Sequence, residues 1–216
     1  MKTRLVLGSV AGLMLVVTSQ VVSQEKRSEA AKPQAAGQQE KQAGEADMRA
    51  MMQQYMEMTA PGPQHEKMAK TVGTWDAVCM SCMAPEAPPI ESKGEAVFSM
   101  MLDGRYLRQD YEGNFMGMPF KGVGIEAYDT FKKEYVSIWM DSMMTSILVL
   151  RGTASADGKT VTLTGKMDDP TTGQMDKDCK TIARYISDDK MVFEMYDKTP
   201  EGKEFRCMEI TYSRRK

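Results

Sequence analysis

From Val72 onward, the chain consists of about ten short runs rich in β-branched and aromatic residues, each bounded by residues that favour turns. Such runs predict β-strands, and the Asp-Gly, Asp-Asp and Glu-Gly pairs between them predict tight turns. No gap is long enough for the helix that a parallel crossover requires, so sequential strands are expected to pair antiparallel. The predicted strands cover residues 72–82, 93–101, 106–113, 119–128, 134–141, 145–154, 160–167, 175–186, 190–197 and 204–213.

A meander of this length predicts a closed barrel. A flat sheet of about ten strands leaves exposed edges and tends to curl, and closing the sheet removes the edges. Barrels of this size also enclose a space that holds one small ligand. We therefore predict an all-β fold, a closed antiparallel meander β-barrel that is lipocalin-like and is preceded by one or two short α-helices.

The first residues have the pattern of a secretory signal peptide. Lys2 and Arg4 are basic, residues 5–17 are apolar, and Val21 and Ser23 fit a small-residue cleavage site. The apolar run is shorter than the roughly 20 residues that a membrane-spanning helix needs. We predict a signal peptide over residues 1–23, no stable membrane span after its removal, and an exported protein that is periplasmic or extracellular.

The composition changes again after the signal peptide. Residues 24–45 are rich in Gln, Ala, Glu and Lys and have no aromatic residue, which predicts a disordered tether. Residues 46–59 carry apolar side chains at helical spacing, and a second short helix is expected over residues 64–71. The predicted domain, a β-barrel with an N-terminal Met-rich helix, covers residues 46–216. The side chains at helical spacing are Met48, Met51, Met52, Tyr55 and Thr59.

Charge balance and motifs limit the function classes. The 28 Lys and Arg residues against 30 Asp and Glu residues give no basic excess for binding a nucleic acid. The chain has one histidine, His65, and no Ser or Cys nucleophile motif, so nucleophilic catalysis has little support. Carboxylates on strands are candidates for acid–base catalysis, but they are more typical of solvated faces. These considerations favour a non-enzymatic role. The carboxylates are Glu126, Asp129, Asp141, Glu194 and Glu209.

Several motifs follow one another along the predicted domain: PGPQH (61–65), VGTW (72–75), APP (87–89), LDGRYL (102–107), MGMPFKGVGIEAYD (116–129), YVSIWMD (135–141), DDPTTG (168–173) and VFEMYDKTPEGKEFRCMEITYSR (192–214). Together they resemble the bacterial family called domain of unknown function 1579. The resemblance covers about residues 46–216, the whole predicted domain. It implies no activity and no catalytic residue that can be transferred to this chain.

The Gly73-Thr74-Trp75 element, placed after a short helix, is similar to the start of lipocalin-like and nitrobindin-like barrels. That likeness implies that Trp75 closes one end of the barrel and meets a basic residue of the last strand, Arg206 or Arg214. A haem in such a barrel would need an axial ligand. Because His65 precedes the barrel, haem binding is not expected, and the sequence leaves the cofactor unknown.

The leading functional hypothesis is the binding of a small apolar molecule in the barrel cavity. Ligand cavities are mostly apolar with a few polar groups. Aromatic residues on the predicted strands are the candidate lining, although the same residues are equally suited to fill a core. The candidates are Trp75, Tyr111, Tyr128, Trp139, Phe193 and Tyr196.

Two alternatives remain open. A periplasmic soft-metal site for copper or zinc is suggested by Cys79, Met80, Cys82 and Met83, with His65 as a further ligand, because thiolates and thioethers bind soft metals. Paired cysteines in an exported protein also form disulfides, and the four cysteines, which include Cys179 and Cys207, allow three pairings. The second alternative is a structural or interaction protein without a ligand.

Overall fold

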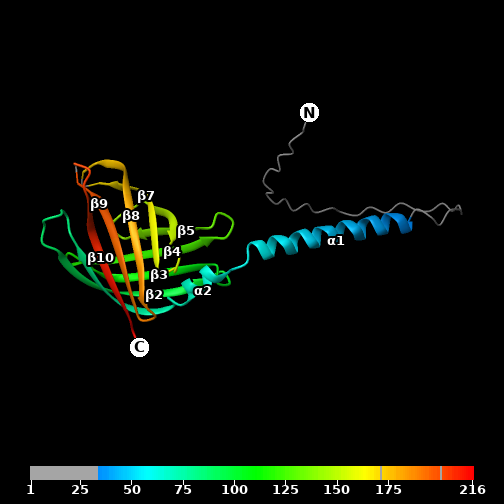
Figure 1. Ribbon diagram of the computed structural model, residues 1–216, viewed down its shortest axis with the longest axis horizontal. Coiled ribbons are helices and arrows are strands. Elements are labelled where there is room, and N and C mark those ends of the chain that lie inside the picture. The colour runs from blue at the N-terminus through cyan, green and yellow to red at the C-terminus, as the bar shows by residue number, and fades with distance from the viewer. Residues whose placement is uncertain (1–33, 171, 200) are drawn as a thin grey trace, which may run out of the picture. The chain divides into compact units, whose positions relative to one another are not determined.

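A computed structural model describes residues 34–170, 172–199 and 201–216 (Figure 1). The chain divides into two units, residues 1–48 and residues 49–216. The predicted signal peptide and the first part of the predicted tether lie outside the described residues. None of the described helices is both long and apolar enough to cross a membrane.

Helix α1 (Gln34–Met58) begins well before the helix predicted at residues 46–59, so it includes part of the segment expected to be a disordered tether. The reason is the composition of that segment, because Ala, Gln, Glu and Lys are strong helix formers even where no apolar face exists. The apolar side chains at helical spacing are exposed, among them Met51 and Tyr55.

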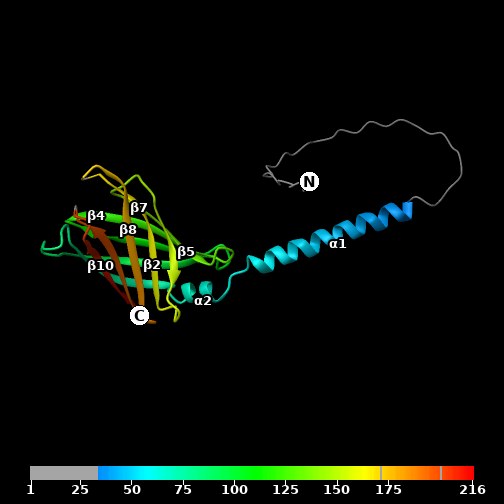
Figure 2. The same cartoon turned by 45° about the horizontal axis from the view of Figure 1, so that its top comes forward.

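Ten strands form a closed barrel in which each strand pairs antiparallel with its neighbours in sequence, and β1 pairs with β10 (Figures 1 and 2). The predicted fold class is therefore confirmed, and each predicted strand corresponds to one observed strand. The strands are β1 (Gly73–Ser81), β2 (Ile90–Met101), β3 (Tyr106–Phe115), β4 (Met118–Asp129), β5 (Glu134–Asp141), β6 (Leu148–Ala154), β7 (Thr160–Asp169), β8 (Gln174–Ser187), β9 (Lys190–Lys198) and β10 (Glu204–Arg214).

The turn between β3 and β4 fixes the register of that hairpin. Met116 and Gly117 both have positive φ, 51° and 84°, as the two central residues of a type I′ turn require. Phe115 consequently pairs with Met118, and the register continues through Tyr111 and Gly122. Each inward-facing position on β3 therefore lies opposite an inward-facing position on β4.

One end of the barrel is closed by helix α2 (Pro63–Ala69), Trp75 and Arg214; we call it the helix-capped end. Met68 of α2 is buried in the barrel core. The indole Nε1 of Trp75 donates to the carbonyl oxygen of Thr71 at 2.8 Å. The guanidinium of Arg214 donates to the carbonyl oxygens of Val72 and Lys70, so the last strand is tied to the segment before the first. The likeness to lipocalin-like barrels correctly implied a basic partner for Trp75, and that partner is Arg214.

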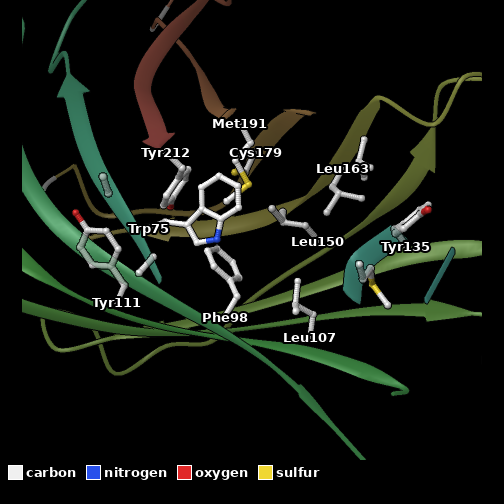
Figure 3. Close-up of a cluster of buried hydrophobic side chains, with 14 residues drawn as sticks. Trp75, Phe98, Leu107, Tyr111, Tyr135, Leu150, Leu163, Cys179, Met191 and Tyr212 are labelled. Atoms are coloured by element: carbon white, nitrogen blue, oxygen red, sulfur yellow. The ribbon is translucent and has the colours of Figure 1, made fainter. Parts of the chain in front are cut away.

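A cluster of buried side chains packs inside the barrel (Figure 3). Trp75, Phe98 and Tyr212 pack edge to face in sequence, with ring centroids 6.4 and 6.1 Å apart. Leu107 is the largest side chain that is completely enclosed. Further apolar side chains pack against this cluster and are only partly buried, from Tyr128 beside α2 to Trp139 toward the opposite end, which we call the loop end.

Candidate ligand-binding site

The space inside the strands is here called the lumen, and one large side chain, that of Trp139, lies flat on its wall. A Cβ atom on Gly122 would lie 2.2 Å from Cζ2 of Trp139, and one on Gly124 would lie 3.3 Å from Cε3. The indole of Trp139 therefore lies along the bare backbone of β4 instead of pointing across the barrel. Its Nε1 donates to Oδ2 of Asp141 at 2.9 Å, and Phe120 stacks on it with centroids 6.5 Å apart.

The carboxyl group of Glu126 lies on the same wall. Glu126 pairs with Ser137 of β5 and with Leu107 of β3, and Ser137 Oγ donates to its Oε1 at 2.8 Å. Burial raises the pKa of Glu126 to about 7, because a charged carboxylate is poorly solvated there, and the Ser137 hydrogen bond only partly offsets this effect. The side chain is nevertheless only partly covered by protein. A raised pKa together with partial accessibility is what we expect of a side chain that lines an internal space.

Hydroxyl and amide groups surround this carboxyl. Gln109 Nε2 donates to the Tyr212 hydroxyl at 3.1 Å. Burial first, and then the nearby charge of Glu126, raise the pKa of Tyr185, which also hydrogen-bonds Thr71. Burial likewise raises the pKa of Tyr212. We call Gln109, Glu126, Ser137, Tyr185 and Tyr212 the polar floor, because they lie at the level where α2 begins to cover the barrel.

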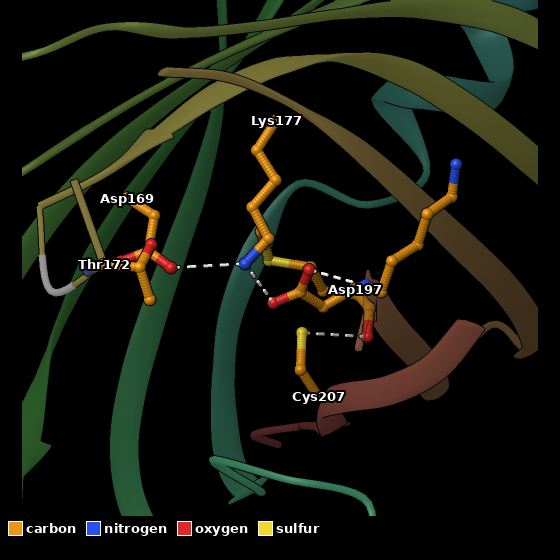
Figure 4. A network of polar contacts seen from close by, with 7 residues as sticks. Asp169, Thr172, Lys177, Asp197 and Cys207 are labelled. Atoms are coloured by element: carbon orange, nitrogen blue, oxygen red, sulfur yellow. Dashed lines mark hydrogen bonds and ion pairs between the residues drawn. The ribbon is translucent and has the colours of Figure 1, made fainter. Parts of the chain in front are cut away.

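A charged network lies at the loop end (Figure 4). Lys177 Nζ contacts Oδ2 of Asp197 at 2.7 Å and Oδ2 of Asp169 at 3.2 Å, which joins β7, β8 and β9. Burial alone would lower the pKa of Lys177, but the hydrogen bonds to the two carboxylates raise it above its usual value. Cys207 Sγ donates to the carbonyl oxygen of Met195 beside this network. The charge of the Lys177 ammonium group is thus already balanced by Asp169 and Asp197. The three residues link neighbouring strands, and Lys177 is not available as a binding site for an anion.

The structure brings most of the predicted lining residues into the barrel. Trp75 and Tyr111 belong to the buried core, and Tyr128, Trp139 and Phe193 pack against it. Tyr196 does not line the lumen. It pairs in register with Lys180 and Arg206 on the outer face, and the Lys180 ammonium lies 4.4 Å from its ring centroid. Alternation along β9 explains this correction, because Phe193 and Tyr196 lie an odd number of residues apart.

The candidate metal ligands are not brought together. Cys79 is buried inside the barrel, the next residue Met80 belongs to the opposite strand face, and Met83 is exposed beyond the strand. His65 lies at the helix-capped end, where its ring packs against Tyr128 and its Nδ1 accepts from the backbone N–H of Gly62. All four cysteines are free thiols. Among the described residues, no group of three or more His, Cys, Asp or Glu side chains is arranged to hold a metal ion.

A hollow of about 230 Å³ lies among β7, β8, β9 and β10. Most of its lining side chains belong to the outer face and are already paired with one another. Lys198 contacts Asp178, and Lys180 contacts Glu204.

Comparison of the sequence with known protein families shows to which family the chain belongs. The family described as "Protein of unknown function (DUF1579)" matches residues 60–214, which include the whole barrel. The chain belongs to the DUF1579 family. No curated protein matches this DUF1579 member. The predicted family resemblance is thus confirmed.

Solved structures share the barrel fold of this DUF1579 protein. The crystal structure of Rv2717c from M. tuberculosis matches with a TM-score of 0.54 and 15% identity, covering 73% of this chain and 100% of that chain. The S-type phycobiliprotein lyase CPES from Guillardia theta matches with a TM-score of 0.51 and 17% identity, covering 70% of this chain and 92% of that chain. At these identities the likeness concerns the fold alone.

Proposed function

We propose that this DUF1579 protein is an exported, non-enzymatic binder of a small, largely apolar molecule, which it holds in the lumen. The observation that carries the proposal is that inward-facing apolar side chains remain partly uncovered although the barrel wall is closed. Trp139, Phe193, Met195 and Ile210 all pack against the core and all retain accessible surface. An apolar ligand that covered these side chains would remove apolar surface from water, which is favourable by about 25 cal/mol for each Å².

The chemistry around the lumen supports binding over catalysis. Acid–base catalysis generally uses two titratable groups whose environments push their pKa values apart. In the described part of the chain, burial and Ser137 are the influences that set the pKa of Glu126, and no second carboxylate or basic side chain contributes. The neighbouring hydroxyls of Tyr185 and Tyr212 have pKa values raised by burial, so they remain neutral hydrogen-bonding groups.

The remaining support comes from the fold and from the sequence. A protein named as a phycobiliprotein lyase has the same barrel fold, which supports the lumen as the binding site for a ligand. The basic and apolar pattern of residues 1–23 supports export to the periplasm or the cell exterior. Fractionation of cells that produce the full-length chain, with detection of the mature N-terminus, tests the export proposal. Retention in the cytoplasm with an intact N-terminus would contradict it.

A lumen-filling variant tests the binding proposal. Ala183 faces the lumen from β8, where it pairs with Phe193, and the adjacent Ile182 belongs to the outer face, opposite Glu194. We expect N-phenyl-1-naphthylamine, a neutral apolar probe, to become fluorescent on binding the protein. Ala183→Phe should weaken this binding by about tenfold or more, equivalent to about 1.4 kcal/mol, because the new ring occupies the ligand space. Ile182→Phe is the matched control and should leave probe affinity unchanged.

Failure of the wild-type protein to bind the probe, or equal affinities for the two phenylalanine variants, would overturn the lumen as the site. Native mass spectrometry of protein purified from its own compartment complements this test. An additional mass that matches an organic molecule, and that is lost in Ala183→Phe, is the expected result.

A further inference from the structure

We propose that the natural ligand carries a hydrogen-bond-donating head group, an amine or a hydroxyl, that binds Oε2 of Glu126 at the polar floor. This inference rests on the proposed function, because it specifies the chemistry of the molecule that enters the lumen. It predicts that the head group enters first and that the apolar body extends toward the loop end.

The first step concerns which oxygen of Glu126 is already used. Oε1 accepts the hydrogen bond from Ser137 Oγ, at 2.8 Å. No hydrogen bond or ion pair from a described residue reaches Oε2. In the described part of the chain, every fully buried side-chain nitrogen or oxygen atom has a hydrogen-bond partner. Oε2 is therefore not sealed by protein; it faces the lumen as an acceptor without a protein donor.

The second step concerns the charges that face this oxygen. The wall around it consists of Leu107 from β3, Ser137 from β5, Tyr185 from β8 and Tyr212 from β10, all of which are uncharged. Lys177, which also faces inward, lies at the loop end and is paired with two aspartates, and the guanidinium of Arg214 is held by backbone carbonyl groups and Trp75. A ligand carboxylate or phosphate at the floor would meet a carboxylate with no cation nearby, which is unfavourable in a medium of low dielectric constant. An ammonium or hydroxyl group would supply the missing donor.

The third step concerns the path from the floor to the loop end. Glu126, Gly124, Gly122 and Phe120 follow one another along the inner face of β4, which corresponds to about 20 Å of strand at 3.3 Å per residue. The Trp139 indole covers the two glycines. The wall above the carboxyl is consequently apolar and aromatic, and it suits an extended alkyl chain or a planar ring system more than a second polar group.

Displacement of N-phenyl-1-naphthylamine by three molecules with the same alkyl chain tests the inference. At pH 8 we expect 1-decylamine to displace the probe best, 1-decanol next, and decanoate at least about tenfold less well than the amine. In Glu126→Gln the preference for the amine over decanoate should disappear. Glu112→Gln, which removes an exposed carboxylate of β3 paired with Lys121, is the matched control and should keep the wild-type order.

A pH series provides a second measurement that does not depend on any variant. Protonation of Glu126 below neutrality removes its negative charge, so the advantage of decylamine over decanoate, which stays ionised at pH 6, should shrink between pH 8 and pH 6. Decanoate that binds as tightly as decylamine at pH 8, or a preference that survives in Glu126→Gln, would overturn the head-group inference while leaving the lumen as the binding site. Absence of any binding of the probe would instead overturn the proposed function itself.

Discussion

The guanidinium of Arg214 lies over the indole of Trp75, with its carbon atom 4.2 Å from the ring centroid. The contact joins the last strand to the first, the pair through which the barrel closes. Arg214 also donates to three backbone carbonyl groups, those of Lys70, Val72 and Asp188. Arg214 therefore ties the last strand to Trp75 and to the segment before the first strand at the helix-capped end.

Replacing this arginine should destabilise the barrel. Arg214→Ala removes the cation–π contact and three charge-assisted hydrogen bonds, so we expect the free energy of unfolding to fall by about 3 kcal/mol. Arg214→Lys should recover only part of it, because an ammonium group lacks the planar fork. Arg108→Ala removes an exposed pair with Asp110 and should leave stability nearly unchanged. Chemical denaturation measures all three, and equal losses for the two alanine variants would contradict the role of Arg214.

The wall contact of Trp139 gives a second prediction. Gly122→Ala places a methyl group 2.2 Å from the indole, which must then leave the wall, and we expect a loss of about 2 kcal/mol. Gly124→Ala, on the same strand face, meets its nearest atoms at 3.3 Å and should be clearly milder. The loss should vanish when Gly122→Ala is made in a Trp139→Ala background. Additive effects in that double variant would show that the indole does not lie where the structure places it.

The strands could be predicted because turn residues and β-branched runs are local signals. The faces of the strands could not, because one slip in register inverts every inward-facing position. The β3–β4 turn illustrates the difficulty. Met116 has positive φ, which is uncommon for a residue other than glycine, and nothing in its identity marks the centre of a type I′ turn. Without that turn, the pairing of Tyr111 with Gly122 cannot be derived.

The candidate site shows the same limit. In the sequence, Glu126 is one of several strand carboxylates that are equally suited to a site. Only the strand register shows that Glu126 faces inward, whereas Glu209 pairs with Arg206 on the outer face. Ser137, Gln109, Tyr185 and Tyr212 were missed because nothing in their local sequence indicates that they converge. The error at Tyr196 could have been avoided, since a regular strand cannot turn both Phe193 and Tyr196 inward.

The only histidine provides a direct test of the helix-capped end. Burial lowers the pKa of His65, the hydrogen bond with the Tyr128 backbone raises it, and the charge of Arg105 lowers it, with a net decrease. We expect the single imidazole signal in NMR spectra to titrate below pH 6.5 in the folded protein and near 6.5 in guanidinium chloride. As the pH falls through this range, the unfolded state gains a proton first, so stability decreases. A folded-state pKa at or above 6.5 would contradict the lowering that burial of His65 is expected to cause.

The cysteines should remain free and should react unequally. Burial raises the pKa of Cys179 to about 11 and that of Cys207 to about 12, and it also raises the pKa of Cys79. Because the thiolate is the reactive form, these three should react slowly with Ellman's reagent at pH 8, while the partly exposed Cys82 reacts first. Cys82→Ser should abolish the fast phase. Unfolding without a reductant should release all four thiols, and a smaller number would reveal a disulfide.

The buried carboxyl makes stability depend on pH in a direction opposite to that of most acids. The pKa of Glu126 is about 7 in the folded state and near its ordinary value of 4.5 in the unfolded state. Between these values the folded state holds a proton that the unfolded state has lost, so stability falls as the pH rises, by about 1.4 kcal/mol per unit. Below pH 4.5 Glu126 is protonated in both states and does not lower the free energy of unfolding. By pH 8 its ionisation has lowered the free energy of unfolding by about 3 kcal/mol.

Glu126→Gln isolates this contribution, because its side chain does not ionise and the other titrating groups cancel when the two proteins are compared. We expect the stability of the variant relative to the wild type to rise between pH 4.5 and pH 8, by about 3 kcal/mol in total. Glu112→Gln, which changes an exposed carboxylate on the outer face, should show no such trend. Denaturant titrations at several pH values measure the differences. A constant difference between Glu126→Gln and the wild type would mean that Glu126 titrates like a solvated carboxylate, and the polar floor would then be open to bulk water.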